Sequence, residues 1–360
     1  MDPLTQGTVG ALFAQTAAKR ERLAIAAGIG CLAGMAPDID VLFRSEADPL
    51  LFLEYHRQFT HALAFIPVGA LICATIGWLV VNRRIPFREA YLYAFLGYAT
   101  HGMVDACTTY GTQLLWPFSD MRVAWNNMSI IDPLFTLPLL ALVIMALTLK
   151  RPAIARTAAV VAVLYAGVGV MQRERAETLG AELAASRDHT PVRLEAKPSF
   201  GQLLLWKIVY EAEGRYYVDA VRVGSSTRVY PGDNIAKLDL DRDLPWLEPG
   251  SLQARDVERF RWFSNRYLAL GDNPNQVIDV RYSMLPNSID PLWAIELTES
   301  EQYDKHVTYV TNRRSSGEQM NLFWRMLRGE PIEGVTDVSQ LRPGAGPASR
   351  ETDLAGVRMD

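Results

Sequence analysis

The sequence has few cysteines and no excess of either charge, and both absences exclude classes of protein. The 360 residues include three cysteines, none in a CxxC spacing. Neither a disulfide framework nor a cysteine zinc site is therefore expected. Lys and Arg number 36 against 40 Asp and Glu, which gives a net charge of −4. This balance excludes a basic protein that coats nucleic acid, and no nucleic-acid partner is expected.

Long apolar runs are present, but only in the first half of the chain. Five runs cover residues 23–37, 62–81, 90–110, 134–149 and 157–171. A helix needs roughly 20 residues to cross ~30 Å of hydrocarbon. The second and third runs reach that length, and the others need flanking residues. The first run can be a full crossing or only an interfacial helix. The first 15 residues lack the pattern of a secretory signal.

The charges of the connecting loops predict an orientation. Basic residues gather in the loops 19–22, 82–88 and 150–156, whereas the connections 38–61 and 111–133 are poor in Lys and Arg. Loops rich in Lys and Arg stay on the cytoplasmic side. With five crossings, the N-terminus is expected in the cytoplasm and the C-terminal half outside it.

The composition changes after residue 172, where a soluble region begins. Residues 173–190 resemble a helical stalk, 203–223 a β-hairpin, and 276–282, 292–297 and 307–310 further strands. Residues 256–270 and 318–328 have helical spacing. The predicted fold class is therefore an α-helical multi-spanning membrane domain of about five hydrophobic helices (1–172), followed by a small α+β soluble domain (173–330). Residues 331–360 are expected to be a disordered tail.

Two clusters of ionisable residues flank the apolar runs. Such groups are costly near hydrocarbon unless they are paired, hydrated or bound to metal. Asp38 and Asp40 follow the first run and point to one side of an extended segment. His56 and His61 precede the second run. Each pair has a plainer interpretation, as a helix cap with a solvated aspartate or as interfacial histidines.

A third cluster lies inside the third run. His101 and Asp105 are spaced i, i+4, and Thr108 continues the same helical face. A mutual hydrogen bond that only pins helices together is the alternative. The predicted orientation brings all three clusters to the outer side. They offer enough imidazoles and carboxylates for one or two divalent metals, with zinc first and manganese or iron as alternatives.

These residues form an ordered set of motifs: Pro37-Asp38-Ile39-Asp40, His56-Arg57-Gln58-Phe59-Thr60-His61, Gly97-Tyr98-Ala99-Thr100-His101 with Asp105, Thr108-Thr109-Tyr110-Gly111 and Leu114-Leu115-Trp116-Pro117-Phe118-Ser119. Over roughly residues 1–150, the set resembles the inner-membrane metal-dependent hydrolases, a family described as LexA-binding and inner-membrane-associated. It is also similar, more distantly, to zinc-dependent phospholipase C.

The resemblance implies a multi-spanning protein of the bacterial inner membrane with metal-dependent hydrolase activity. Carried across by position, the implied ligands are Asp40, His56, His61, His101 and Asp105, and Asp38 would be a further ligand or a support. A LexA contact would be cytoplasmic, whereas the soluble domain is expected outside, so that partner is not expected here.

The leading hypothesis is a membrane-embedded hydrolase that cleaves an ester or phosphoester of a lipid-like substrate at the outer face, with membrane lipid as its partner. Metal-bound water, whose pKa falls towards ~7, would be the nucleophile. Asp38 or Asp105 would accept a proton or orient a ligand. Arg57 would hold a negative charge of the substrate, unless it anchors to headgroups.

A non-catalytic membrane protein is the main alternative. In it the His/Asp or metal network only fastens helices, and the soluble domain binds a protein partner that the sequence does not identify. Metal transport is a weaker third hypothesis, because the polar residues do not continue to the cytoplasmic end of the runs. Catalytic metal sites keep an open position, whereas structural sites are closed.

Overall fold

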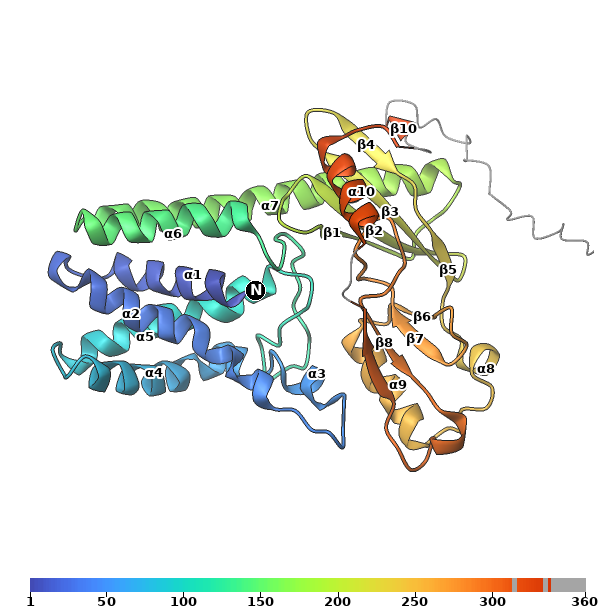
Figure 1. The fold of residues 1–360 in the computed structure, drawn as a ribbon, viewed down its shortest axis with the longest axis horizontal. Helices are drawn as coiled ribbons and strands as arrows, with labels where there is room; N and C mark the ends of the chain where they lie inside the picture. Colours follow the sequence, from blue (N-terminus) through green and yellow to red (C-terminus); the bar gives the residue numbers. More distant parts are fainter. Residues whose placement is uncertain (313–315, 333–335, 338–360) are drawn as a thin grey trace, which may run out of the picture.

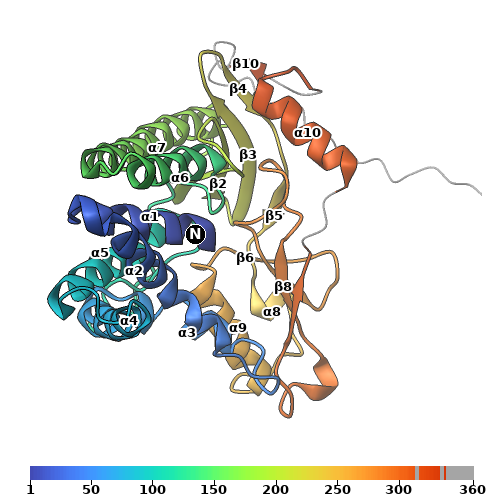
Figure 2. The same ribbon diagram turned by 60° about the vertical axis from the view of Figure 1, so that its left-hand side comes forward.

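The computed structural model describes residues 1–312, 316–332 and 336–337. A helical bundle lies at one end of the molecule and a β-rich domain at the other, and one long helix runs through both (Figure 1). Figure 2 shows the sheet of the second domain standing edge-on beside the end of the bundle. The order of elements confirms a helical N-terminal region followed by a β-sheet-containing domain.

The bundle is built from six longer helices. These are α1 (Pro3–Thr16), α2 (Leu23–Met35), α4 (Ile66–Val80), α5 (Phe87–Ala106), α6 (Pro133–Thr148) and α7 (Pro152–Ser186). Short helical turns connect them: η1 (Arg20–Arg22), η2 (Ala36–Leu42), α3 (Leu51–Tyr55), η3 (Phe59–His61) and η4 (Leu63–Phe65).

Helix α1 was not predicted, and it lies at the centre of the bundle against α2, α5, α6 and α7. Asp2 caps it and Pro3 occupies its first turn, which is the usual start of a helix. Ten of its 14 residues are buried, although several are polar. Because α1 adds one passage along the bundle, the N-terminus lies at the end next to the β-rich domain (Figure 1). The prediction that it shares an end with the basic loops is therefore wrong.

Glycines allow α1, α2 and α5 to approach closely. A Cβ atom on Gly10 would lie 2.3 Å from the carbonyl oxygen of Gly30, and one on Gly97 would lie 2.4 Å from the same oxygen. Small residues at helix contacts are typical of membrane bundles, where backbones pack directly together. The three helices are thus held in van der Waals contact at one level of the bundle.

Three helical segments of the described chain are long and apolar enough to cross a membrane, namely Arg20–Leu42, Leu63–Val80 and Pro152–Ser186. Helix α6 is apolar but has only 16 residues. Helix α5 has 20 residues and includes several ionisable groups. The five predicted crossings are therefore not confirmed.

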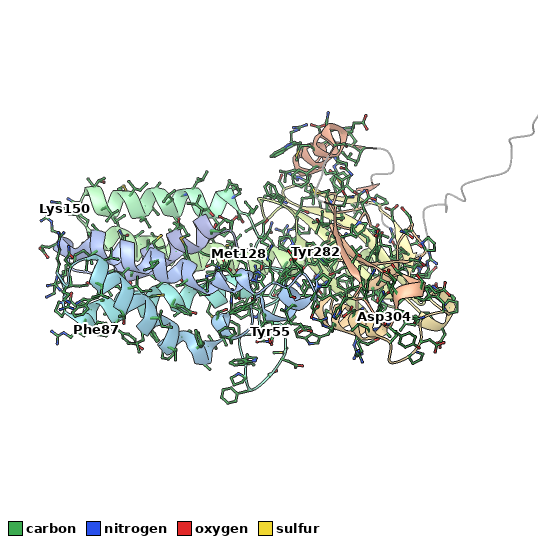
Figure 3. All side chains as sticks on the ribbon, turned by 60° about the horizontal axis from the view of Figure 1, so that its bottom comes forward. Tyr55, Phe87, Met128, Lys150, Tyr282 and Asp304 are labelled. Atoms are coloured by element: carbon green, nitrogen blue, oxygen red, sulfur yellow. The ribbon has the colours of Figure 1, made fainter. Side chains whose placement is uncertain are left out.

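The three basic loops do gather at one end of the bundle. Arg22 forms an ion pair with Glu89, in the first turn of α5 directly after the second loop, and Arg156 of the third donates to the carbonyl oxygen of Thr16, 3.2 Å away. Figure 3 labels Phe87 and Lys150 at this end, far from Tyr55. The loop charges thus mark the end of the bundle opposite the β-rich domain.

The second domain contains two antiparallel sheets. The larger has the order β1-β2-β3-β4-β10, with β5 also paired to β3, and the smaller has the order β6-β7-β8-β9. The larger sheet comprises β1 (Arg193–Pro198), β2 (Leu205–Ala212), β3 (Arg215–Val223), β4 (Thr227–Tyr230), β5 (Asn234–Ala236) and β10 (Thr336–Asp337). The smaller comprises β6 (Leu268–Leu270), β7 (Gln276–Asp279), β8 (Trp293–Glu296) and β9 (Thr308–Thr311), and the helices are α8 (Leu240–Asp243), η5 (Glu299–Glu301), α9 (Leu252–Phe263) and α10 (Gly317–Arg328).

The predicted stalk and hairpin are confirmed. The fifth apolar run and the stalk form one continuous helix of 35 residues, α7. Strands β2 and β3 pair across Glu213 and Gly214, both with positive φ. Every residue of β2 is buried, because α7 covers one face of the sheet and the smaller sheet and α10 cover the other.

Two predictions in this domain need correction. The helix expected over 256–270 is α9, which ends at Phe263, because Asn265 and Arg266 adopt positive φ and turn the chain into β6. Of the tail expected to be disordered, residues 336–337 pair with β4, and residues 333–335 and 338–360 lie outside the described part of the chain.

Candidate metal centre

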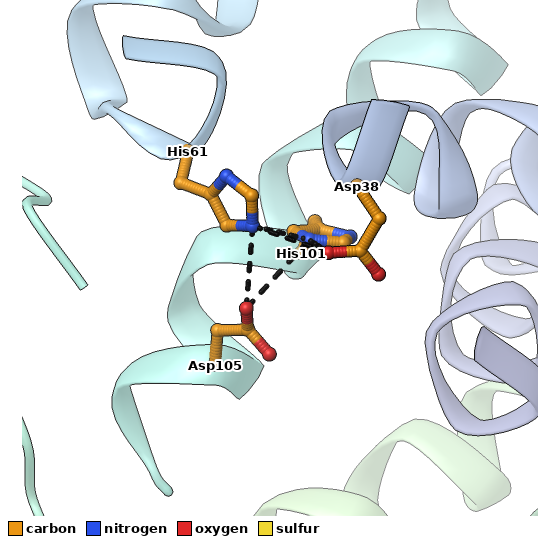
Figure 4. A group of neighbouring side chains, drawn as sticks. All are labelled: Asp38, His61, His101 and Asp105. Atoms are coloured by element: carbon orange, nitrogen blue, oxygen red, sulfur yellow. Dashed lines mark hydrogen bonds and ion pairs between the residues drawn. The ribbon is translucent and has the colours of Figure 1, made fainter. Parts of the chain in front are cut away.

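The predicted ligands converge at the end of the bundle that faces the second domain. Asp38 lies on η2, His61 ends η3, and His101 and Asp105 share one face of α5. Each residue of this quartet offers one ligand atom, and the four atoms lie within 4.8 Å of one another. Figure 4 shows the four side chains pointing to a common point from three segments of the chain. The i, i+4 spacing therefore places His101 and Asp105 on the same face of α5, as predicted from the sequence.

The two imidazoles of the quartet meet through their Nε2 atoms. These atoms are 2.8 Å apart, and Asp38 Oδ1 lies 3.5 Å from that of His61 and 3.4 Å from that of His101. Asp105 Oδ2 lies 3.3 Å from His61 Nε2. Two nitrogens and two oxygens thus surround one small volume.

The other ring nitrogens fix which atoms face that volume. His101 Nδ1 lies 2.6 Å from the carbonyl oxygen of Gly34, which can only accept, so Nδ1 carries a proton. His61 Nδ1 lies 3.1 Å from Asp40 Oδ2 and is placed to donate to it. Metal-binding histidines are typically held in this way by a carbonyl or a carboxylate. Two Nε2 lone pairs then face each other, and a cation between them would relieve their repulsion.

Without a metal, that cation is a proton. Burial lowers the pKa of His61, but hydrogen bonds to Asp105, Asp38 and Asp40 outweigh it and raise the pKa to about 10. A proton on His61 Nε2 could then be shared with His101. Metal binding at such a site releases protons, because the ligands must be deprotonated.

Asp40 and His56 lie beside the quartet. Asp38, Asp40 and His56 form a second group whose ligand atoms also lie within 4.8 Å of one another. Asp40 is fully buried, and its oxygens lie 2.7 Å from His56 Nδ1, 2.8 Å from Thr60 Oγ1 and 2.9 Å from the Arg57 amide nitrogen. Asp38 belongs to both groups.

Arg57 does not face solvent. Its side chain is about 4% exposed, and its Nε lies 3.0 Å from Asp105 Oδ2. The guanidinium also donates to Thr108 Oγ1 at 3.0 Å and lies over the ring of Tyr110. Headgroup anchoring does not fit such a buried side chain. Arg57 also has a positive φ of 67°, a conformation that is costly for a side-chain-bearing residue and is often found at functional sites.

Asp38 and His56 are the partly exposed members of the two ligand groups. The side chains of Asp40, His61, His101 and Asp105 are fully buried, whereas Asp38 is 23% exposed and His56 18%. On η2, the same turn as Asp38, the apolar residues Ile39, Val41 and Leu42 are exposed. Asp38, the more exposed of the two, thus lies next to an apolar surface.

Sequence reasoning missed the contribution of α1. Gln6 Nε2 donates to Asp105 Oδ1 at 2.9 Å, and the amino group of Met1 also contacts Asp105. Buried Thr5, Gln6 and Gln15 lower the mean apolarity of this helix, so no apolar run marked it. The signal that could have found it is the Asp-Pro start of a helix at residues 2–3. Asp132 caps α6, since its side chain accepts hydrogen bonds from the Leu134 and Phe135 amides.

The second domain closes over the centre through Tyr110. The ring of Tyr110 lies 5.6 Å from that of His56 and 5.1 Å from that of Phe263 on α9. Arg259 of α9 also bonds Asp48, with nitrogen–oxygen distances of 2.8 and 2.9 Å. The bundle and the second domain thus share side chains at this end.

Two known proteins are similar in sequence to part of this chain. The chain is 32% identical over 112 residues to the uncharacterized protein YfhP of Bacillus subtilis (strain 168), covering 31% of this chain and 34% of that protein. It is 34% identical over 97 residues to the inner membrane protein YbcI of Escherichia coli (strain K12), covering 26% of this chain and 54% of that protein. The chain therefore spans about a third to a half of the length of these relatives, and no solved structure matches it.

A match to a known protein family covers the whole candidate metal centre. All six residues of the two ligand groups lie between positions 38 and 105. The family described as YdjM inner membrane protein matches residues 1–176, which end within α7. Together with the apolar helices, this match indicates an inner-membrane location. The N-terminal region of the chain is thus similar to the YdjM inner membrane protein family.

Proposed function

We propose that this protein is a metal-dependent hydrolase of the bacterial inner membrane, which cleaves an ester or phosphoester of a lipid-like substrate at the outer face. The observation that carries the proposal is the facing pair of Nε2 atoms, 2.8 Å apart, with Asp38 and Asp105 beside them. Two imidazoles and two carboxylates suit zinc, and also manganese or iron. A divalent metal held there would supply Lewis-acid activation of water and of the scissile group.

The residues of this chain would then have distinct tasks. Asp40 orients His56 and His61 through their Nδ1 atoms. Arg57 is committed to Asp105 and Thr108, so we assign it to position Asp105 rather than to hold substrate. Asp38 is the carboxylate on the accessible side, and it is placed to take a proton from an incoming group.

The surroundings of the opening support a lipid-like substrate. Ile39, Leu42 and Phe43 follow Asp38 directly and are exposed, Leu42 by 74%. Exposed apolar side chains next to a polar opening are expected where a protein meets the hydrocarbon edge of a bilayer. A substrate with an apolar tail could lie on this surface with its polar end at Asp38.

Metal content is the first test. We expect near-stoichiometric zinc, manganese or iron in detergent-purified protein by elemental mass spectrometry. The metal should be lost in the double variant His101→Ala, Asp105→Ala. A matched control is His189→Ala, since His189 lies in the second domain and contacts Tyr210 instead. No metal in the wild type, even after reconstitution with divalent ions, would overturn the proposal.

Activity is the second test. The metal-loaded protein should hydrolyse bis-p-nitrophenyl phosphate or a fluorogenic phospholipid, and Asp38→Asn should lower kcat by at least about tenfold, in the range that proton-transfer groups contribute. A metal-bound protein that hydrolyses none of a broad set of esters and phosphoesters would contradict the hydrolase assignment.

The Arg57–Asp105 ion pair favours a second candidate, a structural network that only fastens helices. Asp105 already forms an ion pair with Arg57, so its charge is balanced without a metal. In that case the double variant would lose stability, and neither protein would bind metal.

A further inference from the structure

A separate cavity of about 330 Å³ lies where the bundle meets the second domain. The bundle contributes Tyr110 and Ile130, and the second domain contributes Phe200, Tyr282 and Trp293. Figure 3 labels Met128 and Tyr282 at this junction. None of the metal-centre residues lines the cavity, which is mostly apolar and has the size of a small-molecule site.

Three buried cations form the polar part of the cavity. Lys197, Lys207 and Arg281 all line it, and each is at most 5% exposed. Lys197 of β1 and Lys207 of β2 are direct cross-strand partners. Like charges directly opposite each other destabilise a sheet. The sequence therefore keeps a repulsive pair at a buried position.

Carboxylates form ion pairs with two of these three cations, but not with Lys207. Glu195 pairs with Lys197, and Asp279 holds Arg281 through contacts of 2.7 and 2.9 Å. Lys207 Nζ instead donates to Ser283 Oγ at 2.7 Å and to the Ser288 carbonyl oxygen at 2.8 Å. Within the described part of the chain, no ion pair with a carboxylate is formed by Lys207.

Such a charge is expensive to keep. An ammonium group taken out of water needs a counter-charge, or it gives up its proton. Burial lowers the pKa of Lys207 to about 7. The charges of Asp279 and Asp233 act against this shift, and the charge of Lys197 adds to it. An anion placed in the cavity beside Lys207 would supply a direct counter-charge and would accept the third ammonium proton.

The mouth of the cavity is apolar and lies near the start of the apolar helix α6. Ile130, Phe200 and Met320 line the cavity and are all exposed, Phe200 by 55%. The Gly201 amide donates to Ser129 Oγ at 3.1 Å, four residues before α6 begins at Pro133. The mouth is therefore at the level where α6 would enter the bilayer.

We propose that this cavity binds an anionic amphiphile derived from the membrane, with its carboxylate or phosphate head at Lys207 and its tail against Phe200, Met320 and Trp293. The cationic floor selects an anion, and the apolar walls and mouth select an acyl chain over a free inorganic ion. The proposal does not depend on the metal centre.

Binding can be measured by native mass spectrometry of the full-length protein released from detergent. The probes are dodecanoate, dodecyl phosphate, inorganic phosphate and dodecyltrimethylammonium. We expect one saturable adduct with dodecanoate or dodecyl phosphate, and the better of the two identifies the head group. Inorganic phosphate and the cationic amphiphile should bind at least about tenfold more weakly.

Two variants test the site, each with a matched control. Lys207→Met should weaken binding at least about tenfold, since a charge-assisted contact is lost, whereas Lys305→Met changes an exposed lysine and should not. Met320→Glu puts a negative charge at the exposed mouth and should weaken binding relative to Met320→Gln. This second pair keeps the test valid if Lys207→Met does not fold.

Several results with the wild-type protein and the variants would overturn the proposal. The proposal fails if neither dodecyl anion forms a saturable adduct, or if inorganic phosphate binds as tightly as dodecyl phosphate. It also fails if Lys207→Met and Met320→Glu both bind as the wild type does. Metal content should be the same in all of these proteins, so the result is independent of the hydrolase proposal.

Discussion

The bundle and the second domain distribute polarity in opposite ways. In the bundle, large apolar side chains such as Ile72 and Leu164 are exposed, while His101 and Asp105 are fully buried. In the second domain, apolar side chains such as Trp206 fill the core, as is usual in water. The two regions therefore fold in different solvents, and each should tolerate different substitutions at its surface.

The largest effect is expected when an exposed apolar residue of each region is replaced by lysine. Ile72→Lys, in the middle of α4, should cost about 2.5–3.5 kcal/mol of insertion free energy if α4 faces lipid. Val192→Lys, at an even more exposed position of the second domain, should change stability by about 0.5 kcal/mol or less. The fraction of protein integrated in membranes measures the first, and thermal unfolding in detergent measures the second. Equal tolerance at both positions would contradict the lipid-facing assignment.

The close contact of α1, α2 and α5 predicts the next largest effect. Gly30→Ala would place a Cβ atom 2.4 Å from both Ala14 Cβ and the Gly10 carbonyl oxygen, so overpacking should cost about 1–3 kcal/mol. Gly167→Ala on α7 meets no atom within 4 Å and should leave stability unchanged or slightly improved. Denaturation in detergent compares the two variants. A Gly30→Ala protein as stable as the Gly167→Ala protein would show that the helices do not pack this closely.

The buried side chain of Lys207 predicts that the stability of the second domain depends on pH. The pKa of Lys207 is lowered to about 7 in the folded protein but is near 10.4 in an unfolded chain. Between these values the unfolded state binds more protons, so stability should rise as pH increases from about 7 towards 10. Lys207→Met should flatten this rise, and Lys305→Met should not. Melting temperatures across this pH range measure both variants, and identical slopes would count against an unbalanced charge at Lys207.

The ion pairs between the two regions predict the smallest effect. Arg259 bonds Asp48 and Glu54 across the junction, and partly exposed pairs contribute up to about 1 kcal/mol. Arg259→Gln should raise hydrogen exchange in residues 44–56, while Arg242→Gln, whose ion pair with Asp243 stays within the second domain, should not. Unchanged exchange in the first variant would mean that apolar contacts alone hold the junction.

Much of the candidate metal centre could be predicted, because ionisable residues inside an apolar run are energetically unfavourable unless they have a polar partner. His101 and Asp105 lie inside an apolar run, where only a shared polar partner justifies them, and their spacing specified one helix face. The loop charges likewise placed Asp38, His56 and His61 at the same end. The hydrogen-bond partners of these ligands could not be predicted in this way. The Gly34 carbonyl oxygen and the Gln6 side chain contact His101 and Asp105 only because α1 and α2 pack against α5.

The second domain shows the same limit for a different reason. The hairpin and strands followed from alternation, but α9 was predicted to be longer, because nothing in the spacing of Phe260, Phe263 and Tyr267 marks the turn at Asn265 and Arg266. The cavity at Lys207 was not predicted either. It depends on the register that sets Lys197 opposite Lys207, which is long-range information.

The unbroken course of α7 has a mechanical consequence. Residues 152–186 extend for about 52 Å at 1.5 Å per residue, without an interruption between the bundle and the sheet. Inserting a single residue midway would turn the second domain by about 100° around the helix axis. Phe263 would leave Tyr110, and Arg259 would leave Asp48. The number of residues in α7 therefore determines how the second domain is rotated relative to the candidate metal centre.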